Sequence, residues 1–457
     1  MPRAPKGCPH VRLQLEPSAY AEEAGYVWIS ADRRLAATTS SGRNPLLARG
    51  QGTGVLEKLT HEAAAKLSDA FPGPLVLPDD DLALDPKCQP QSFRSWLNEK
   101  ARNKPTKGRQ TLYVAAVPEI TSGVGFMEDW LRPSIGKGKK VLSSEKLASP
   151  PADDFVEYLS AFYHGLPVKP FPHDLGFVPW TKSKKSSKQG KGTSYVGLLA
   201  GNNCTRIRAR PSLDGVFKGQ LNLNDLLDAA IEMLPDDAYS IILLVNHDMY
   251  EDEDDDFCCG RAYGGSRVAV VSSARYHPIL DDHAEIDYAH MWPASHCKSY
   301  VESVCAAEGL KPEAKATKGV GSVSGPLRVA VEAAKGLKEP STPEDRRALW
   351  FSRLVRTVAH ELGHCLGIGH CVYYACVMQG TAGMAEDVRQ PPYLCPVCLS
   401  KVSYAIAYEL QGRKEAGQGE YALERYRSLA EFCDSWGQVG LFAGYGAWLR
   451  ARLQQLE

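Results

Sequence analysis

One short stretch of the chain constrains its fold and its chemistry more than any other: HELGHCLGIGHC, residues 360–371. On an α-helix each residue turns by about 100°, so His360, Glu361 and His364 share one face. That arrangement allows two neutral imidazoles to bind a zinc ion while the carboxylate reaches a water molecule beside it. The stretch therefore predicts the end of a helix that carries metal ligands.

The third histidine of the stretch, His370, predicts that this helix ends before it. A continued helix would carry His370 about 240° around and about 9 Å along the axis from His364, out of reach of the same ion. Gly367 lies where the helix must stop, since glycine enters the left-handed region without a steric penalty. Three protein ligands leave a fourth position open for water, which is typical of catalytic rather than structural zinc.

Four cysteines follow at spacings typical of a second metal site. Four residues separate Cys371 from Cys376, and two separate Cys395 from Cys398. This is the spacing of a four-thiolate zinc site, with two disulfides or buried free thiols as the alternatives. Cys365 points about 100° away from His364 and is interpreted as a small core residue rather than a ligand.

The motif HExxHxxGxxH, with Met378 just downstream and the four cysteines around it, resembles the archaemetzincin family of metzincin metalloproteases, eukaryotic type. The resemblance implies an α+β (α/β-like) zincin fold: a twisted mixed β-sheet with an active-site helix, and a small, mainly helical C-terminal subdomain. It implies Glu361 as general base, Met378 as the Met-turn residue beneath the metal, and two zinc ions per chain. The ligands would be His360, His364 and His370 for the catalytic ion, and Cys371, Cys376, Cys395 and Cys398 for the structural ion.

From this site we expect a zinc-dependent peptidase that cleaves peptide bonds with zinc-activated water, as an aminopeptidase or as an endopeptidase on short peptides. A zinc-stabilised binding or scaffold protein with little hydrolytic activity is the alternative, although such a protein would not need Glu361. A nucleic-acid-binding zinc module is disfavoured by the formal net charge of -1. The expected partners are a peptide or protein substrate, no nucleic acid and no membrane, and the chain is expected to be a monomer.

The cysteine content and the start of the chain favour a reducing compartment. Thirteen cysteines is an odd number, and a group of them at zinc spacing fits thiols better than a disulfide framework. Residues 1–20 contain no apolar core of a signal peptide, and no apolar run is long enough to span a bilayer. We therefore expect a cytoplasmic or nuclear protein that is not secreted.

Three regions are expected along the chain. Residues 1–105 form an N-terminal extension that is partly loosely ordered: residues 1 to about 55 have weak periodicity and many Gly, Ser, Arg and Pro residues, and are expected to be loosely ordered or draped on the core. Residues 106–370 form the upper subdomain, with inserts near 135–192 and 277–341. Residues 371–457 form the lower subdomain, with the Met-turn and the cysteine site.

Hydrophobic periodicity and capping residues predict the main elements. Strands are expected over residues 111–117, 239–245 and 267–273. Helices are expected over residues 59–71, 224–234, 343–366, 399–410, 421–432 and 441–456, the third of them capped by Thr342. By resemblance to metzincins, residues 264–272 are the candidate edge strand that pairs with an extended substrate.

Several polar or titratable groups have a modest interpretation. The lysine-rich runs at 136–140 and 182–188 are interpreted as solvated surface, and residues 309–338 as a mobile insert. The acidic run 251–256 is either solvated or lies by the cleft, where it would attract cationic peptide ends or bind calcium weakly. The residues His283, His290, His296 and Cys297 lack tight ligand spacing, so loop or core roles are expected for them.

Overall fold

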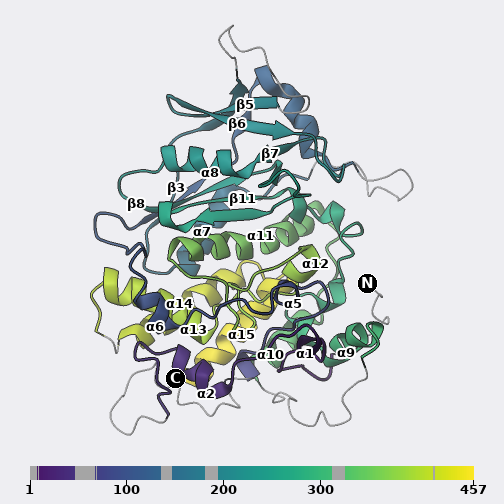
Figure 1. The fold of residues 1–457 in the computed structure, drawn as a ribbon, viewed down its shortest axis with the longest axis vertical. Helices are drawn as coiled ribbons and strands as arrows, with labels where there is room; N and C mark the ends of the chain where they lie inside the picture. The colour runs from purple at the N-terminus through teal and green to yellow at the C-terminus, as the bar shows by residue number, and fades with distance from the viewer. Residues whose placement is uncertain are drawn as a thin grey trace.

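The computed structural model describes residues 8, 10–46, 67, 69–134, 147–180, 194–310, 325–414 and 417–457. Within these ranges the chain is a mixed α/β protein, with two β-sheets in the upper half of Figure 1 and mainly helices in the lower half. Among the helices in these ranges, none combines the length and the apolar character needed to cross a bilayer.

The five-stranded sheet is built on three parallel strands that are buried along their whole length: β1 (Thr111–Ala115), β8 (Ala238–Val245) and β11 (Val268–Ser272). Such apolar runs are typical of strands with both faces covered. The strand order is β10-β11-β8-β1-β3, with β3 (Val168–Pro170) parallel to β1 and β10 (Gly260–Tyr263) antiparallel to β11. The sheet is therefore mixed, with all three predicted strands inside it.

The predicted position of the substrate edge, residues 264–272, is wrong. Strand β11 fills most of that range and lies between β10 and β8, so both of its backbone edges are already paired. The edge is β10, a short strand whose residues are exposed or partly exposed. The prediction relied on the apolar sequence of β11. Such a sequence indicates a buried strand, whereas an open edge strand is usually short or polar.

Helices cover both faces of this sheet. Helix α8 (Leu223–Glu232) lies on one face, between the two sheets, and α7 (Ala152–Phe162) and α11 (Pro343–Cys365) lie on the other (Figure 1). Helix α8 begins at Leu223, one residue before the predicted start at Asn224: the side chain of Asn222 caps it by accepting a hydrogen bond from the amide of Asp225 at 3.1 Å.

A second, six-stranded sheet lies at the top of the molecule (Figure 1). In spatial order its strands are β2 (Glu119–Ile120), β4 (Leu175–Pro179), β5 (Ser194–Ala200), β6 (Asn203–Arg210), β7 (Gln220–Asn222) and β9 (Asp248–Tyr250). The inner face of the sheet shares a hydrophobic core with α8 and with β8 and β11.

Residues 147–180, inside the insert predicted near residues 135–192, form packed elements of the fold. Helix α7 buries Tyr158 and Phe162 in the main core, and β3 and β4 each pair in a sheet. The lysine-rich runs at 136–140 and 182–188, which suggested the insert, lie outside the described residues.

The mobile insert predicted over residues 309–338 is also wrong where the structure describes it. Helix α10 (Pro326–Ala334) packs against α15 (Gly440–Leu456), and its residues Leu327, Ala330 and Val331 are buried. Upstream, α9 (Lys298–Ala307) buries Val301 and Val304 against Leu77. Residues 277–341 are therefore integrated in the fold, apart from 311–324, which lie outside the described part.

The long helix α11 forms as its sequence predicts. Thr342 and Asp345 make a capping box at its start, and Pro343 occupies the first helical position. The stripe of Leu354, Val358 and Leu362 is buried, which anchors the helix beneath the five-stranded sheet. The helix ends at Cys365, just before Gly367 with a φ of 76°.

The lower half contains the three expected C-terminal helices, α13 (Pro396–Ser403), α14 (Gly417–Asp434) and α15. A π-helix over Tyr404–Leu410 continues α13. Of the helix expected over 59–71, Leu67, Asp69 and Ala70 are helical, and residues 59–66 and 68 lie outside the described residues.

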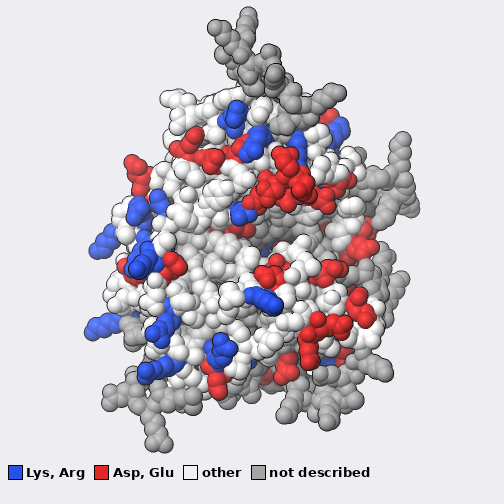
Figure 2. Space-filling model, in the orientation of Figure 1, with Lys and Arg blue, Asp and Glu red and all other residues white. Residues whose placement is uncertain are grey.

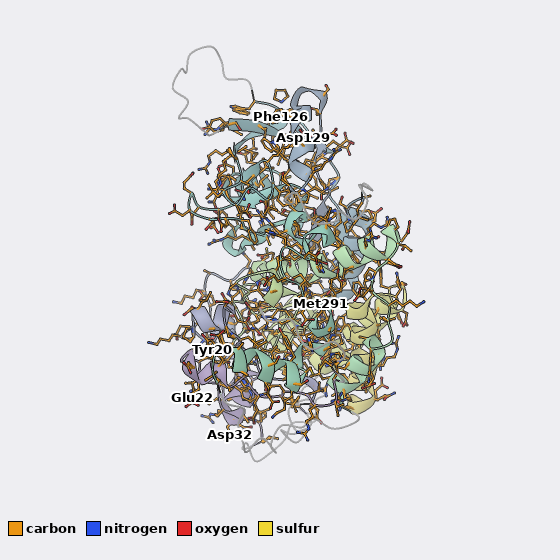
Figure 3. All side chains as sticks on the ribbon, turned by 90° about the vertical axis from the view of Figure 1, so that its right-hand side faces the viewer. Tyr20, Glu22, Asp32, Phe126, Asp129 and Met291 are labelled. Carbon is orange, nitrogen blue, oxygen red and sulfur yellow. The ribbon has the colours of Figure 1, made fainter. Side chains whose placement is uncertain are left out.

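The N-terminal residues cover the lower half. Helices α1 (Tyr20–Glu23) and α2 (Ala31–Ala37) lie near the bottom, at the opposite end from Phe126 and Asp129 (Figure 3). Tyr26 Oη donates to the carbonyl of Val372 at 2.8 Å, and Trp28 Nε1 donates to the carbonyl of Tyr373 at 2.9 Å. This part of the extension is thus packed on the loop that follows His370.

Candidate metal centre and active-site cleft

The end of α11 and the loop after it bring three imidazoles together. The Nε2 atoms of His360 and His364 lie 2.9 Å apart. The ring centroid of His370 lies 5.3 Å from that of His360 and 5.1 Å from that of His364. One nitrogen of each ring lies within 4.8 Å of the others. The turn at Gly367 therefore places His370 beside the other two histidines, as the spacing predicts.

Backbone carbonyls orient the two helical imidazoles. His360 Nδ1 lies 2.8 Å from the carbonyl of Val377, and His364 Nδ1 lies 2.7 Å from that of Ile368. A protonated Nδ1 donates each bond and leaves the Nε2 lone pair free for a metal. Burial and the neighbouring histidines lower the pKa of His360 well below its usual range, and burial and His370 lower that of His364 to about 4. Both rings are therefore neutral at neutral pH, as metal ligands must be.

Glu361 is buried beside this cluster and lines the cleft. Strand β10 passes close to it: a Cβ added at Gly260 would lie 3.4 Å from Glu361 Cγ. Burial raises the pKa of Glu361 to about 8, opposed by the nearby Arg261 guanidinium. Three imidazole nitrogens that lie close together, next to a carboxyl group, fit a zinc ion with an open fourth position.

Met378 lies directly against the histidine-bearing helix. A Cβ added at Gly363 would lie 2.4 Å from Met378 Sδ, so the glycine is what allows this contact. Met378 is fully buried, and its carbonyl accepts a hydrogen bond from the Cys371 amide at 2.7 Å. Sequence reasoning assigned no role to Gly363, although a glycine between two ligand histidines is the signal that could have found this close approach.

The four cysteines after His370 also converge. Their Sγ atoms all lie within 4.8 Å of one another, and the thiols are buried. Cys376 Sγ accepts hydrogen bonds from the amides of Cys395 at 3.2 Å and Met378 at 3.5 Å. The Sγ atoms of Cys371 and Cys395 lie 3.5 Å apart, and all thirteen cysteines are free thiols, so the disulfide alternative is not what this structure contains. Cys365 is buried in the core, as interpreted.

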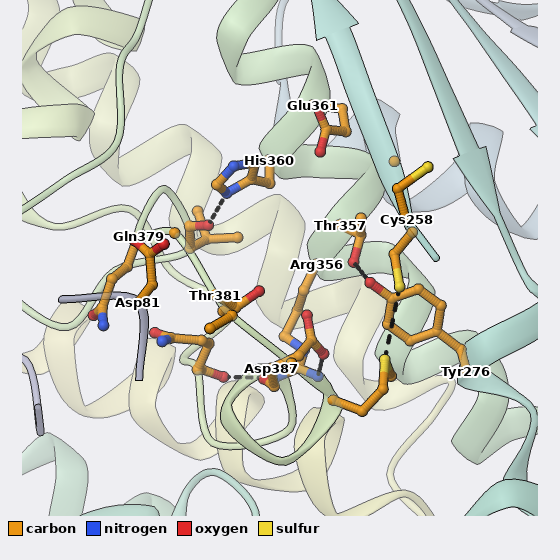
Figure 4. A pocket seen from close by; sticks show the side chains of 18 of the residues that line it. Asp81, Cys258, Tyr276, Arg356, Thr357, His360, Glu361, Gln379, Thr381 and Asp387 are labelled. Atoms are coloured by element: carbon orange, nitrogen blue, oxygen red, sulfur yellow. Dashed lines mark hydrogen bonds and ion pairs between the residues drawn. The ribbon is translucent and has the colours of Figure 1, made fainter. Parts of the chain in front are cut away.

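A cleft of about 310 Å³ opens beside His360, Glu361 and His370 (Figure 4). Its far wall is the loop after Met378. The short helix α12 (Met384–Asp387) follows, and the carboxylate of its last residue, Asp387, pairs with Arg356 of α11 at 2.6 Å. Tyr276 Oη bonds Thr357 Oγ1 at 2.6 Å on the β11 side. The cleft is thus framed by helix α11, residues 257–260 and the segment from Gln379 through helix α12.

The N-terminal extension contributes Asp81 to the cleft, a residue that sequence reasoning missed (Figure 4). A Cβ added at Gly380 would lie 2.3 Å from Asp81 Oδ2 and 2.9 Å from His370 Nδ1, so both side chains crowd the same glycine. Burial raises the pKa of Asp81, and His370 opposes that shift. No local pattern marks Asp81, because its partners lie far away in the sequence.

The acidic run 251–256 leads directly into the cleft wall at residues 257–260. Arg210 holds the loop by donating to the carbonyls of Asp252, Glu253 and Asp255. Glu251 pairs with Arg261 of β10. Figure 2 shows acidic side chains gathered above the hollow in the middle of this face. The run is thus largely exposed and adjoins the cleft wall, and the residues that line the cleft begin at Phe257.

Comparison with known proteins agrees with this site. Residues 322–404 match Peptidase family M54. The chain is 23% identical to the archaemetzincin-2 proteins of Macaca fascicularis and Homo sapiens over 380 residues, which is 83% of this chain and 79% of theirs. It is 29% identical to Homo sapiens archaemetzincin-1 over 229 residues, which is 49% of this chain and 36% of that protein. The crystal structure of Methanopyrus kandleri archaemetzincin is 16% identical, covers 66% of this chain and 98% of its own, and has a TM-score of 0.30.

The histidine cluster with its buried glutamate and the family match together define a zinc metallopeptidase. Both candidate metal clusters lie within the matched segment. Within these spans the chain is similar to the archaemetzincins.

Proposed function

We propose that this chain is a metzincin-type peptidase in which His360, His364 and His370 hold the catalytic zinc and Glu361 is the general base. The observation that carries this proposal is the approach of one nitrogen from each ring to within 4.8 Å of the others, beside the buried carboxylate. Zinc held there would supply Lewis-acid chemistry, which polarises the scissile carbonyl and makes water a better nucleophile.

Glu361 acts as the general base and then as the general acid of the reaction. Its carboxylate accepts the proton of the attacking water and then donates it to the leaving amine. Burial, which raises the pKa of Glu361 to about 8, makes it a stronger base than an exposed glutamate. A bound cation would oppose that shift and keep the group ionised before the proton transfer.

Strand β10 is the proposed binding site for the substrate backbone. It pairs with β11 on one side only, and Gly260 of β10 lines the cleft. An edge strand binds an extended peptide through main-chain N–H and C=O groups, so its affinity depends little on side chains. A peptide paired to β10 would pass beside Glu361.

The four cysteines are the proposed ligands of a structural zinc ion, which makes two zinc ions per chain together with the catalytic one. Cys371 follows His370 directly, and its amide bonds the carbonyl of Met378. A metal at the cysteines would therefore fix the loop that carries both His370 and Met378, the proposed Met-turn residue.

The acidic surroundings of the cleft support an aminopeptidase or a short-peptide endopeptidase. Asp81 lines the cleft, and the acidic run 251–256 lies by its wall, so both would attract the protonated amino end of a peptide. We also propose a cytoplasmic or nuclear location and a monomeric state. The thirteen free thiols support a reducing compartment.

The Glu361→Gln variant tests the mechanism. It should keep the zinc content of the parent and reduce peptide cleavage at least about 10²-fold, because the amide cannot accept the proton. Glu344→Gln, at an exposed position near the start of the same helix, is the matched control and should retain full activity. Mass spectrometry of a digested peptide library would give the cleavage positions.

Two results would contradict the proposal. One is full activity of Glu361→Gln. The other is a zinc-loaded parent that cleaves no peptide in the library, which would instead support a zinc-stabilised binding or scaffold protein.

A further inference from the structure

A third cluster of metal-ligand side chains lies outside the cleft and outside the matched family segment. It consists of Cys8, His10, His290 and Cys297, each of which offers one atom within 4.8 Å of the others. The Sγ atoms of Cys8 and Cys297 are 3.2 Å apart, and the rings of His10 and His290 meet edge to face at 5.2 Å. Two segments 289 residues apart in the sequence thus bring two sulfur and two nitrogen atoms together.

Both histidines of this cluster have a free nitrogen. The Nε2 atoms of His10 and His290 are buried, and neither has a nitrogen or oxygen partner among the described residues; besides Asp287, the His290 ring interacts with the thiols of Cys297 and Cys8. His290 is 1% exposed, so water cannot satisfy its Nε2. Such a buried and unpartnered nitrogen is costly unless something else binds it.

The other ring nitrogens are held as metal-binding histidines usually are. His290 Nδ1 lies 2.8 Å from the carboxylate of Asp287, which orients the ring and makes it more basic. The remaining nitrogen of His10 bonds the backbone of Ala289. Both contacts orient the rings and leave Nε2 as the nitrogen that would face a metal.

The two sulfur atoms also have support around them. Ser299 Oγ lies 3.1 Å from Cys8 Sγ and 3.2 Å from Cys297 Sγ, where its hydroxyl can donate to a thiolate. The Sγ atoms are too far apart for a disulfide, which requires about 2.05 Å. Two thiolates and two imidazoles are the ligand set of tetrahedral structural zinc.

We propose that this chain has a further zinc site, with Cys8, His10, His290 and Cys297 as its four protein ligands. Because all four positions are filled by protein atoms, the site is structural rather than catalytic. It lines a hollow separate from the cleft, in the part of the molecule where Figure 3 labels Met291.

The site fastens the start of the described chain to the body of the protein. Next to it, the amide of Gln14 bonds the carbonyl of His296 at 2.7 Å, and the amide of Lys298 bonds the carbonyl of Arg12 at 2.9 Å. Metal bound at the site would lock this short pairing and, through it, the extension that continues to Asp81 in the cleft.

The test compares zinc content in the full-length chain, purified without chelators, by native and inductively coupled plasma mass spectrometry. The double variant Cys8→Ser/His10→Ala removes two ligands from the chain end and leaves the buried pair in place. It should bind one zinc ion fewer than the parent. Val11→Ser is the matched control. It changes the residue next to His10, whose side chain is 66% exposed, and it should leave the zinc content equal to that of the parent.

A second measurement, thiol alkylation of the parent protein, tests the site even if the double variant does not fold. In the parent, alkylation of Cys8 and Cys297 should be slow and should become fast after a chelator is added. Equal zinc in the parent and the double variant would overturn the proposal. So would an oxidised Cys8–Cys297 peptide in protein that was alkylated on lysis. Peptide cleavage by the double variant should persist, which separates this site from the catalytic one.

Discussion

Replacing Gly264 by alanine should damage the active site through the backbone of α11 rather than through a metal ligand. The new Cβ would lie 2.4 Å from the carbonyl oxygen of His364 and 3.2 Å from its carbonyl carbon. A carbon and an oxygen atom in contact stand about 3.3 Å apart, so one of the two backbones must move by close to 1 Å. The same carbonyl accepts the amide of Gly367 at 2.9 Å, in the turn that brings in His370.

The size of the effect follows from two opposing contributions. Overpacking against a backbone that cannot rotate away costs about 1–3 kcal/mol. A Gly→Ala change also lowers the conformational entropy of the unfolded chain, which stabilises the folded state by about 0.4–1 kcal/mol. We expect Gly264→Ala to lower the free energy of unfolding by about 1–2 kcal/mol and to reduce kcat/KM about 10²-fold, because a ligand shifted by about 1 Å is misplaced for the reaction.

Gly265 provides a matched control one residue away. A Cβ at this position would have no atom within 4 Å, and both glycine carbonyls accept a hydrogen bond from Asn103 Nδ2. Gly265→Ala should therefore leave kcat/KM unchanged and change the free energy of unfolding by no more than a gain of about 1 kcal/mol. Urea unfolding and cleavage of one peptide substrate measure both quantities. Equal results for the two variants would refute the reasoning.

Three further outcomes are expected. Gly363→Ala should destabilise the parent but not a Met378→Ala variant, because the contact at 2.4 Å between the new Cβ and Met378 Sδ is absent there. Urea unfolding of this double-mutant cycle should give a coupling energy of about 1–3 kcal/mol between the two positions. A coupling energy of zero would contradict the contact. Asp387→Asn leaves Arg356 buried without its carboxylate and should cost about 3–5 kcal/mol in the same assay. Asp434→Asn, which breaks an exposed pair with Arg450, should cost less than about 1 kcal/mol, and equal costs would exclude a special role for the buried pair. Dialysis against a strong chelator should lower both peptide cleavage and the thermal unfolding midpoint, and added zinc should restore them; an unchanged midpoint would exclude structural metal.

Short-range patterns allowed the metal-binding helix and its surroundings to be predicted. Thr342, the HExxH spacing and Gly367 act within a few residues of their partners, so periodicity and backbone preference are enough to define α11 and the turn after it. The same holds for β8 and β11, whose apolar runs mark buried strands.

Elements that depend on distant partners could not be predicted in this way. Strand β10 has four residues, one of them Arg261, and forms only because β11 offers a free edge. Helix α10 lies next to a polar stretch and becomes integral by packing on α15. Strands β2, β7 and β9 of the upper sheet have only two or three residues each, too few for an alternating pattern to stand out.

The residues of the metal sites and the cleft also divide into those that short-range patterns predict and those that depend on distant partners. The three histidines and the four cysteines lie close together in the sequence at recognisable spacings. Asp81, Cys8 and His10, in contrast, are brought to their partners only by the fold. His290 and Cys297 have no ligand spacing of their own, which is why loop or core roles were expected for them. Gly363 and Gly380 are required by contacts across the fold, which a single sequence does not record.

Anomalous scattering at the zinc edge from crystals of the protein would locate each ion against the proposed ligands. The mechanism requires a peak about 2.0–2.1 Å from a nitrogen of each of His360, His364 and His370, with solvent at the fourth position beside Glu361. A histidine cluster without a peak, or a peak whose fourth position is closed by a protein atom, would contradict catalysis by zinc at this site.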